Sequence, residues 1–379
     1  MRVLLTSPRA PVTLDLARRL NTQGNNVFVC DSLRFALGAF SRGCSFLRVP
    51  RAMDSPQGYV ACLEEIVQQH QIDWLIPTCE EVFAIAAYQS QLSCNILVDS
   101  IDKLRNIHDK WTFSQNASNE FASVPESQRL VSLECVESYR ETSGQFVFKP
   151  CFSRFASETM ISPTFEALKT IDISTSKPWI AQRRVRGIEY STYSVARHGK
   201  LLAHSCYTSS YRAGTGSGIY FVPQEQSQIL NFVTKFIEQF QYTGQIGFDC
   251  IVDEAEVAWI LEGNPRATSG LHLFSEDQPL SDAILGTHSD LIYAPVKRPV
   301  MLAAAMPIWG LAQAIKRIAP FQFLADLLRA RGILFRWRDP LPALMLPVTI
   351  AELMQLAVRE KASLQQVSTL DIEWNGEKL

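Results

Sequence analysis

Two acidic side chains, Asp249 and Glu262, lie on neighbouring apolar runs separated by the polar stretch 253–256. If that stretch connects two antiparallel strands, Glu262 lies opposite Gly247. In the same register Asp249 lies opposite Ile260. Both carboxylates then emerge on one face as diagonal neighbours, about 7–8 Å apart at the backbone. Because such carboxylates repel each other unless a cation lies between them, the spacing predicts a cation site, with room for the ion beside Gly247.

The residues that follow add ligands of the same chemical class. Asn264 provides a neutral oxygen just past the strand end, and Arg266 provides a fixed positive charge suited to phosphate or carboxylate. A ligand set made only of oxygen atoms suits Mg²⁺, which takes one or two carboxylates together with substrate phosphates. A surface hairpin with solvated acids is the alternative, since Asp and Glu are mostly exposed.

Basic side chains elsewhere could face such a site. Lys149 ends the apolar strand 146–150, where its ammonium group could meet a phosphate as a point charge, and Lys110 lies on a predicted helix. Arg212, in the glycine-rich stretch 209–218, could bind a substrate carboxylate, or that stretch could be a flexible surface turn.

The elements that must position these residues fall into three parts. Residues 1–99 alternate short apolar runs with amphipathic patterns, which predicts a parallel α/β sheet with helices on its faces. Ligands of such sheets bind beyond the carboxyl ends of the strands, where Glu81 is a candidate substrate contact. Residues 100–290 have an α+β pattern with hairpins, and residues 291–379 are predicted to be mostly helical.

Composition narrows the class of protein. The 379 residues are 47% apolar and 20% charged, with a net charge of −2, which excludes a disordered chain and gives no overall field for nucleic acid. The nine cysteines are scattered without C-x-x-C spacing, so we expect neither a disulfide framework nor a zinc cluster, and a reducing compartment. The apolar runs are too short for a signal peptide or a membrane span. We therefore expect a cytoplasmic protein with no membrane partner and no nucleic-acid partner.

An ordered set of motifs resembles the ATP-grasp superfamily, and within it the carbamoyl-phosphate-synthetase-like ligases. The set is Lys149-Pro150, then Gln182-x-x-Val185-x-Gly187-x-Glu189, then Asp249, then Glu262-x-Asn264-Pro265-Arg266. The resemblance covers about residues 100–275 and implies an ATP-grasp fold of two α+β lobes, preceded by the α/β domain. A narrower similarity, to the ligases that form mycosporine-glycine, rests on Lys177-Pro178-Trp179-Ile180, Tyr242-Thr243-Gly244-Gln245-Ile246 and Trp337-Arg338-Asp339-Pro340-Leu341-Pro342.

The resemblance implies that ATP and Mg²⁺ bind between the lobes. Lys149, helped by Lys110, would contact the α- and β-phosphates, and Arg266 would steady the transferred phosphoryl group or an acyl phosphate. The implied metal ligands are Asp249, Glu262 and Asn264.

The stretch between the lobes would bind the adenosine. By the resemblance, Gln182 would reach the adenine amine, while Arg183 and Val185 would use their backbone carbonyl and N–H on the adenine edge. Glu189 would accept hydrogen bonds from the ribose hydroxyls.

One departure concerns the loop 151–159, which contains none of the glycines that wrap the phosphates in this superfamily. Either Arg154 and nearby serines substitute for them, or the loop is a weaker clamp and phosphoryl transfer is impaired. We therefore expect an ATP-dependent ligase that joins a small-molecule carboxylate to an amine through an acyl phosphate. The alternatives are a non-catalytic ATP-binding protein of the same fold and, less favoured without a glycine fingerprint, an NAD-linked enzyme. Homodimer formation stays open.

Overall fold

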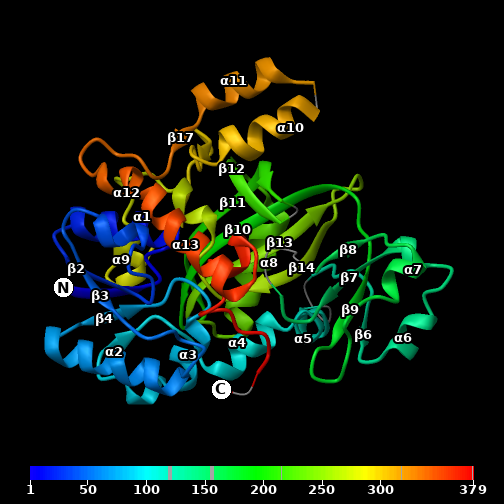
Figure 1. The fold of residues 1–379 in the computed structure, drawn as a ribbon, viewed down its shortest axis with the longest axis horizontal. Helices are drawn as coiled ribbons and strands as arrows, with labels where there is room; N and C mark the ends of the chain where they lie inside the picture. The colour runs from blue at the N-terminus through cyan, green and yellow to red at the C-terminus, as the bar shows by residue number, and fades with distance from the viewer. Residues whose placement is uncertain (118–121, 154–157, 215, 317, 378) are drawn as a thin grey trace.

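The computed structural model describes all residues except 118–121, 154–157, 215, 317 and 378. It contains three sheets, which Figure 1 shows side by side: a parallel sheet from the first hundred residues, a large central sheet and a small sheet at the opposite end. The predicted mixture of α/β and α+β structure is confirmed. Within the described residues no helix has the length and apolar character needed to cross a bilayer.

The first sheet has five parallel strands in the order β3-β2-β1-β4-β5. The chain moves outward from β1 in one direction and then returns to β1's other side with β4, so the crevice where such sheets bind ligands lies at the carboxyl ends of β1 and β4. The strands and their main helices are β1 (Arg2–Thr6), α1 (Pro11–Thr22), β2 (Asn26–Asp31), β3 (Cys44–Arg48), α2 (Pro56–His70), β4 (Trp74–Ile76), α3 (Val82–Ala87) and β5 (Asn95–Ile96).

Two helices lead from this sheet toward the small one, and Lys110 begins the second of them, so its predicted helical position is confirmed. The first, α4 (Ile101–His108), ends at Asp109, and the second, α5 (Lys110–Ala117), begins directly after it. Asp109 accepts hydrogen bonds from the Trp111 N–H and the Thr112 hydroxyl, so it caps the new helix and breaks the old one.

The small sheet is antiparallel, in the order β6-β9-β7-β8. Its apolar core includes Tyr139, whose ring packs edge-on against Phe146 and Phe148. The elements are β6 (Ser127–Leu130), α6 (Leu133–Glu137), β7 (Phe146–Pro150), β8 (Met160–Ile161), α7 (Phe165–Leu168) and β9 (Trp179–Arg183).

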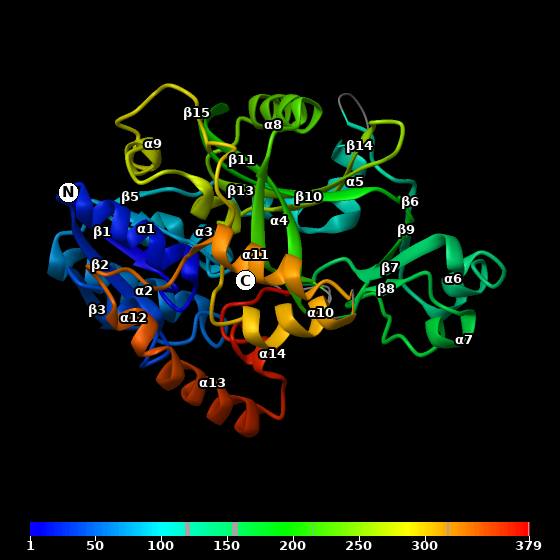
Figure 2. The same ribbon diagram turned by 90° about the horizontal axis from the view of Figure 1, so that it is seen from above.

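The large sheet is built on the long antiparallel strands β10 to β13 and is covered on one face by α8, which buries Ile229, Phe232 and Phe236. Figure 2 shows α8 and the long helix α13 (Leu346–Glu360) on opposite sides of the molecule. The elements are β10 (Ile188–Arg197), β11 (Lys200–Ala213), β12 (Ser217–Gln224), α8 (Ser227–Gln239), β13 (Gly244–Val252), β14 (Ala258–Asn264), α9 (Leu280–Leu285), β15 (Ile292–Tyr293), β16 (Val300–Met301) and β17 (Arg331–Gly332).

The last part of the chain is mostly helical, as predicted, although β16 and β17 join it to the edge of the large sheet. Its helices are α10 (Leu311–Lys316), α11 (Pro320–Arg329), α12 (Leu341–Leu344), α13 (Leu346–Glu360) and α14 (Leu364–Val367).

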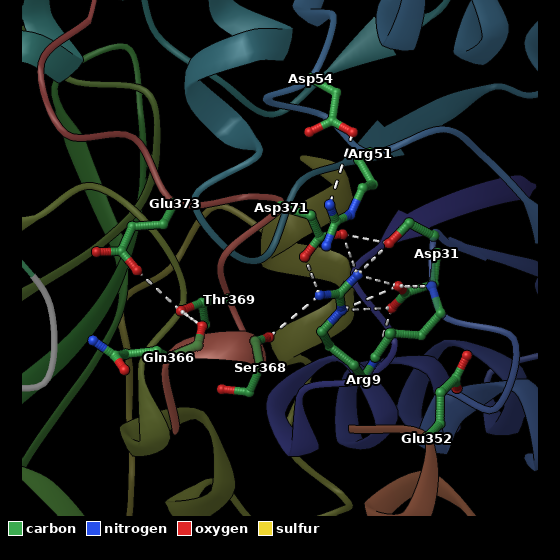
Figure 3. Close-up of polar contacts among 12 residues, drawn as sticks. Arg9, Asp31, Arg51, Asp54, Glu352, Gln366, Ser368, Thr369, Asp371 and Glu373 are labelled. Carbon is green, nitrogen blue, oxygen red and sulfur yellow. Dashed lines mark hydrogen bonds and ion pairs between the residues drawn. The ribbon is translucent and has the colours of Figure 1, made fainter. Parts of the chain in front are cut away.

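The segment after α14 fastens this part to the parallel sheet. Arg9, at the end of β1, lies between two carboxylates: it is hydrogen-bonded to Asp31 of β2 and, through Nη1 at 2.5 Å and Nη2 at 2.8 Å, to Asp371 (Figure 3). Ile372 then enters the apolar core of the parallel sheet, and Trp374 enters the core beneath α4 and β13. The segment therefore bridges the first domain and the centre of the molecule.

We predict a loss of stability in mild acid from His204, which is buried in β11 with its Nδ1 3.0 Å from the Ser194 hydroxyl. Burial lowers the pKa of His204 to about 4. In the unfolded chain the imidazole of His204 becomes protonated near pH 6.5, whereas in the folded protein it stays neutral down to about pH 4. The stability that the neutral, buried imidazole contributes is therefore fully present above pH 6.5 and is lost as the pH falls toward 4. It amounts to at most about 3 kcal/mol. Urea unfolding should show a smaller acid loss for His204→Gln than for the wild type; an identical loss would contradict the assignment.

Candidate active site

The two acids of the β13–β14 hairpin lie directly opposite each other. Asp249 pairs with Glu262, whereas the next pair toward the turn is Cys250 with Ile260. Leu261 is therefore an extra residue in β14, a β-bulge. Without it Glu262 would lie opposite Phe248 on the core-facing side; the bulge moves it to the face of Asp249.

This pairing corrects the predicted register. Both carboxylates do share a face, but they are direct rather than diagonal neighbours, because the connection is one residue longer than predicted and the bulge shifts the strand again. Gly247 lies opposite Asn264 instead of Glu262. A Cβ at Gly247 would come within 2.6 Å of the Thr192 carbonyl and 2.5 Å of Thr268, so the glycine serves close packing and not an ion cavity.

Asp249 is held in a polar, half-buried position. Its Oδ1 accepts a hydrogen bond of 2.6 Å from the Ser191 hydroxyl of β10, and its Oδ2 lies 3.2 Å from the Asn264 amide nitrogen. Burial, together with the negative charge of Glu262, raises the pKa of Asp249 to about 6. A raised pKa means that the anion lacks enough compensating charge, which is what a cation would supply.

Glu262 faces the small sheet's lysine. Its Oε2 lies 3.2 Å from Nζ of Lys149 and 3.9 Å from Nζ of Lys110. Burial alone would raise the pKa of Glu262, but the two ammonium groups hold it at about 2. Lys149 comes from β7 and Lys110 from the start of α5, so this cluster joins the small sheet to the large one.

Arg266 connects the hairpin to the first domain. Its Nη2 lies 3.2 Å from Oδ1 of Asn264, and its Nε lies 3.3 Å from Oε1 of the fully buried Glu80. The other oxygen of Glu80 accepts a hydrogen bond from the backbone N–H of Trp374. The ligand-binding crevice of the parallel sheet, the hairpin and the C-terminal segment therefore meet at one carboxylate.

Glu81, the acid that the sequence selected in this crevice, has a different position. It is fully buried, and its Oε1 accepts hydrogen bonds from the Thr6 hydroxyl and from the N–H groups of Thr78 and Cys79. These contacts tie β1 to the turn after β4. Glu81 therefore holds the turn, and its part as a substrate contact stays a prediction. Its neighbour Glu80 is the acid that reaches Arg266.

The stretch between the small and large sheets has the position that the sequence predicted. Gln182 and Arg183 are the last residues of β9, Val185 lies in the irregular segment that follows, and Glu189 is the second residue of β10. Gln182 is buried, with its amide nitrogen 3.4 Å from the Ser127 hydroxyl, whereas Glu189 is exposed.

Glu189 and Arg212 form an ion pair across β10 and β11, so two residues assigned to different ligands touch each other. The main chain of Arg212 is also held by Gln313 of α10, whose Oε1 accepts from its N–H at 3.3 Å. If Glu189 accepts hydrogen bonds from a ribose, Arg212 competes for the same oxygen atoms.

We therefore predict that Arg212→Ala tightens ATP binding two- to fivefold, since an exposed ion pair contributes at most about 1 kcal/mol. Isothermal titration calorimetry with Mg·ATP measures this directly, and Arg140→Ala, which breaks the exposed ion pair with Glu137 outside the nucleotide site, is the matched control. Weaker binding by Arg212→Ala would mean that the arginine positions Glu189 instead of competing for it.

Two further features complete the site. Arg154, the predicted substitute for the missing glycines, lies outside the described residues, but the Ser153 carbonyl before it accepts a hydrogen bond of 3.2 Å from Nζ of Lys110. His108 is buried among Phe83, Phe152 and Trp374, with its pKa lowered to about 4 by burial. The His108 imidazole is therefore neutral at pH 7.

The side-chain oxygen atoms on this face suit a small cation that prefers oxygen ligands. Asp249 and Glu262 are carboxylates on one face of the hairpin. Asn264 now turns its amide nitrogen toward Asp249 and its oxygen toward Arg266, so it would join the carboxylates as a ligand by reversing its amide. Within the described residues no cluster of three or more His, Cys, Asp or Glu side chains could hold a metal by itself. Two carboxylates and an amide fit Mg²⁺ when phosphate oxygens supply the remaining ligands.

Sequence reasoning missed three residues of this site: Glu80, Ser191 and Trp374. Glu80 follows the strand end where the sequence analysis selected its neighbour Glu81. Ser191 is the cross-strand partner of Asp249 in β10, which a register for that pair would have revealed. Trp374 follows the β13–β14 hairpin by more than a hundred residues, and no sequence pattern around it indicates that it reaches the site.

A family model matches the central part of the chain. Residues 107–270 match the family model of the ATP-grasp domain. Comparison of the sequence with curated proteins gives no match, and the narrower similarity to the mycosporine-glycine-forming ligases stays a prediction.

Several solved structures share the fold. N5-carboxyaminoimidazole synthetase from Staphylococcus aureus has a TM-score of 0.63 at 13% identity, over 83% of this chain and 86% of that chain. Biotin carboxylase from Campylobacter jejuni has 0.58 at 11% identity, over 78% and 74%. L-amino acid ligase from Bacillus licheniformis has 0.56 at 10% identity, over 75% and 74%. The chain therefore contains an ATP-grasp domain and has the fold of the ATP-grasp ligases.

Proposed function

We propose that this protein is an ATP-dependent carboxylate–amine ligase that acts through an acyl phosphate and releases ADP and phosphate. One observation carries the proposal: the opposed carboxylates Asp249 and Glu262 of the large sheet face Lys149 and Lys110, which come from the small sheet and from α5. An arrangement of acids on one side and ammonium groups on the other suits a triphosphate with its counter-ion. The fold shared with ATP-grasp ligases supports the same activity.

The residues divide the work of nucleotide binding. Lys149 and Lys110 would pair with phosphate oxygens, which lets Glu262 turn from the lysines toward the cation. Mg²⁺ held by Asp249, Glu262 and Asn264 would neutralise charge on the phosphates. Residues 182–189, between the two sheets, would hold the adenosine.

The chemical steps then need positioning and charge stabilisation. An oxygen of the substrate carboxylate attacks the γ-phosphorus, the bond to ADP breaks, and an acyl phosphate forms. The amine next attacks the acyl carbon and phosphate leaves. Arg266, fixed between Asn264 and Glu80, would steady the phosphoryl group through both steps.

A non-catalytic ATP-binding protein is the second candidate, because the loop 151–159 has no glycine. The intact acid pair on β13 and β14 argues for catalysis, since the two carboxylates are direct cross-strand neighbours that repel each other without a cation, and phosphoryl transfer uses such a cation.

Trapping the intermediate tests the proposal. The purified full chain, Mg·ATP and a panel of carboxylates are mixed with hydroxylamine as a general nucleophile, and hydroxamate and ADP are measured. We expect equal amounts of both with at least one carboxylate, and roughly tenfold weaker ATP binding by Lys149→Ala in calorimetry. ATP binding without ADP release for every carboxylate would favour the second candidate.

A further inference from the structure

The helices α10 and α11 form a hairpin that projects from the edge of the large sheet, at the top of Figure 1. Its inner face is anchored. Phe323 and Ala314 are buried against Tyr211 and Tyr220 of the sheet, and the Tyr211 hydroxyl donates a hydrogen bond of 2.8 Å to Asp326. The hairpin is therefore a fixed part of the fold with a defined outer face.

That outer face is apolar where an exposed helix face is normally polar. Along α10 and the turns beside it, the spacing of the exposed side chains is helical, and α11 continues the pattern. The exposed residues are Ile308, Leu311, Ile315, Ile318, Phe321, Leu324 and Leu328. Three of them, Ile318, Phe321 and Leu328, expose 90%, 86% and 83% of their surface. An apolar patch of this kind marks an interaction site.

The turn of the hairpin adds an independent observation. Ile318 has a φ of 55°, in the left-handed region that disfavours β-branched residues. Asparagine or glycine would fit this backbone better, and the exposed isoleucine side chain gains little burial to offset the strain. Folding stability therefore does not explain an isoleucine at this position, whereas an apolar surface outside the protein would.

Charge indicates the kind of surface. Residues 296–332 contain six Lys or Arg and one Asp, a net charge of +5, whereas the whole chain has −2, so the remainder carries −7. Lys297, Lys316 and Arg329 are exposed. Arg298 donates to the Arg329 carbonyl and Arg331 to the His272 carbonyl, so these two are held by the protein. The single acid, Asp326, is engaged by Tyr211. A two-fold contact between copies through this face would place like charges together. An anionic surface would instead match them.

We propose that the α10–α11 hairpin docks the protein on an anionic lipid bilayer, with Ile318 and Phe321 entering the acyl boundary and the basic side chains at the headgroups. The helices are too short to span, so the protein lies on the surface. Docking on a bilayer would make a membrane surface a partner, where the sequence led us to expect none. It does not depend on the ligase activity, because the hairpin contains none of the nucleotide-site residues.

Vesicle co-sedimentation without nucleotide tests the inference. The full chain is mixed with phosphatidylcholine vesicles that either contain or lack phosphatidylserine. We expect binding only to the anionic vesicles, weakened by salt, and at least about tenfold weaker for Ile318→Asn/Phe321→Asn. Lys316→Gln and Arg329→Gln should each weaken it about fivefold. Leu133→Asn, at a half-exposed leucine of α6 in the small sheet's domain, is the control and should bind normally.

Folding and self-association are checked in the same samples. Ile318→Asn/Phe321→Asn should keep or slightly raise the melting temperature, because asparagine tolerates the backbone at Ile318, and should bind Mg·ATP as the wild type does. Equal pelleting with both vesicle types, or none with either, overturns the inference. Light scattering that shows a dimer broken by the double variant, without vesicle binding, would assign the hairpin to a second copy of the chain instead.

Discussion

Glu262→Gln should lower ADP release by about 1000-fold, equivalent to about 4 kcal/mol of transition-state stabilisation. The substitution keeps the shape of the side chain and removes the charge that faces Asp249 across the hairpin. Because Lys149 and Lys110 remain, ATP should still bind without Mg²⁺, and with equal or higher affinity, since both ammonium groups lose their internal partner. A split between retained binding and lost turnover is what a metal ligand predicts.

The stability of this variant separates the metal role from a structural one. Leaving two largely buried ammonium groups without Glu262 should cost the nucleotide-free protein roughly 1–3 kcal/mol, which ATP binding restores. Glu254→Gln, at an exposed position in the turn of the same hairpin, should change neither activity nor melting temperature. Turnover by Glu262→Gln within about tenfold of the wild type would remove the metal assignment.

Arg266→Lys should lower kcat by about 100-fold while the affinity for ATP changes little. Lysine keeps a positive charge beside the buried Glu80, so folding is preserved, but it loses the planar fork that contacts Asn264 and Glu80 together. The effect should fall on the hydroxylamine-trapped product and on ADP release alike, because the same guanidinium serves the phosphoryl group throughout.

The matched control for this variant is Arg140→Lys, at an exposed position after α6 and outside the nucleotide site, which should be fully active. If Arg266→Lys instead raised the KM for ATP with an unchanged kcat, the arginine would be a nucleotide-binding residue with no part in the transfer step. Loss of folded protein would point to its contact with Glu80 as its main role, which a melting curve distinguishes.

Local patterns in the sequence determined the elements and most of the acids and bases. The alternation of apolar runs with helical patterns in residues 1–99 predicted a parallel sheet, and the polar turn after residue 252 predicted a hairpin. Both predictions were possible because each signal consists of residues that are close together in the chain. The resemblance to the ATP-grasp superfamily extended these predictions to the roles of the site residues, because the motifs occur in the same order along the chain.

The pairing of residues between β13 and β14 could not be predicted from the sequence. A bulge adds one residue to β14 near Leu261, and no local pattern marks it, because the choice between two pairings depends on how Phe248, Cys250 and Ile260 pack beneath the sheet. The sequence placed both acids on one face through a register that was wrong at each pair. Only the folded sheet could say that Asp249 and Glu262 are direct neighbours.

The contacts that join distant segments were decided by tertiary structure alone. Glu80, Arg266 and Trp374 meet because the parallel sheet, the hairpin and the C-terminal segment pack on a common core, and their separation along the chain leaves no periodic signal. The sequence thus determined which chemical groups are present and on which elements they lie. Packing decided which of them touch, because the free energy that selects one long-range arrangement is summed over many buried side chains and resides in no single motif.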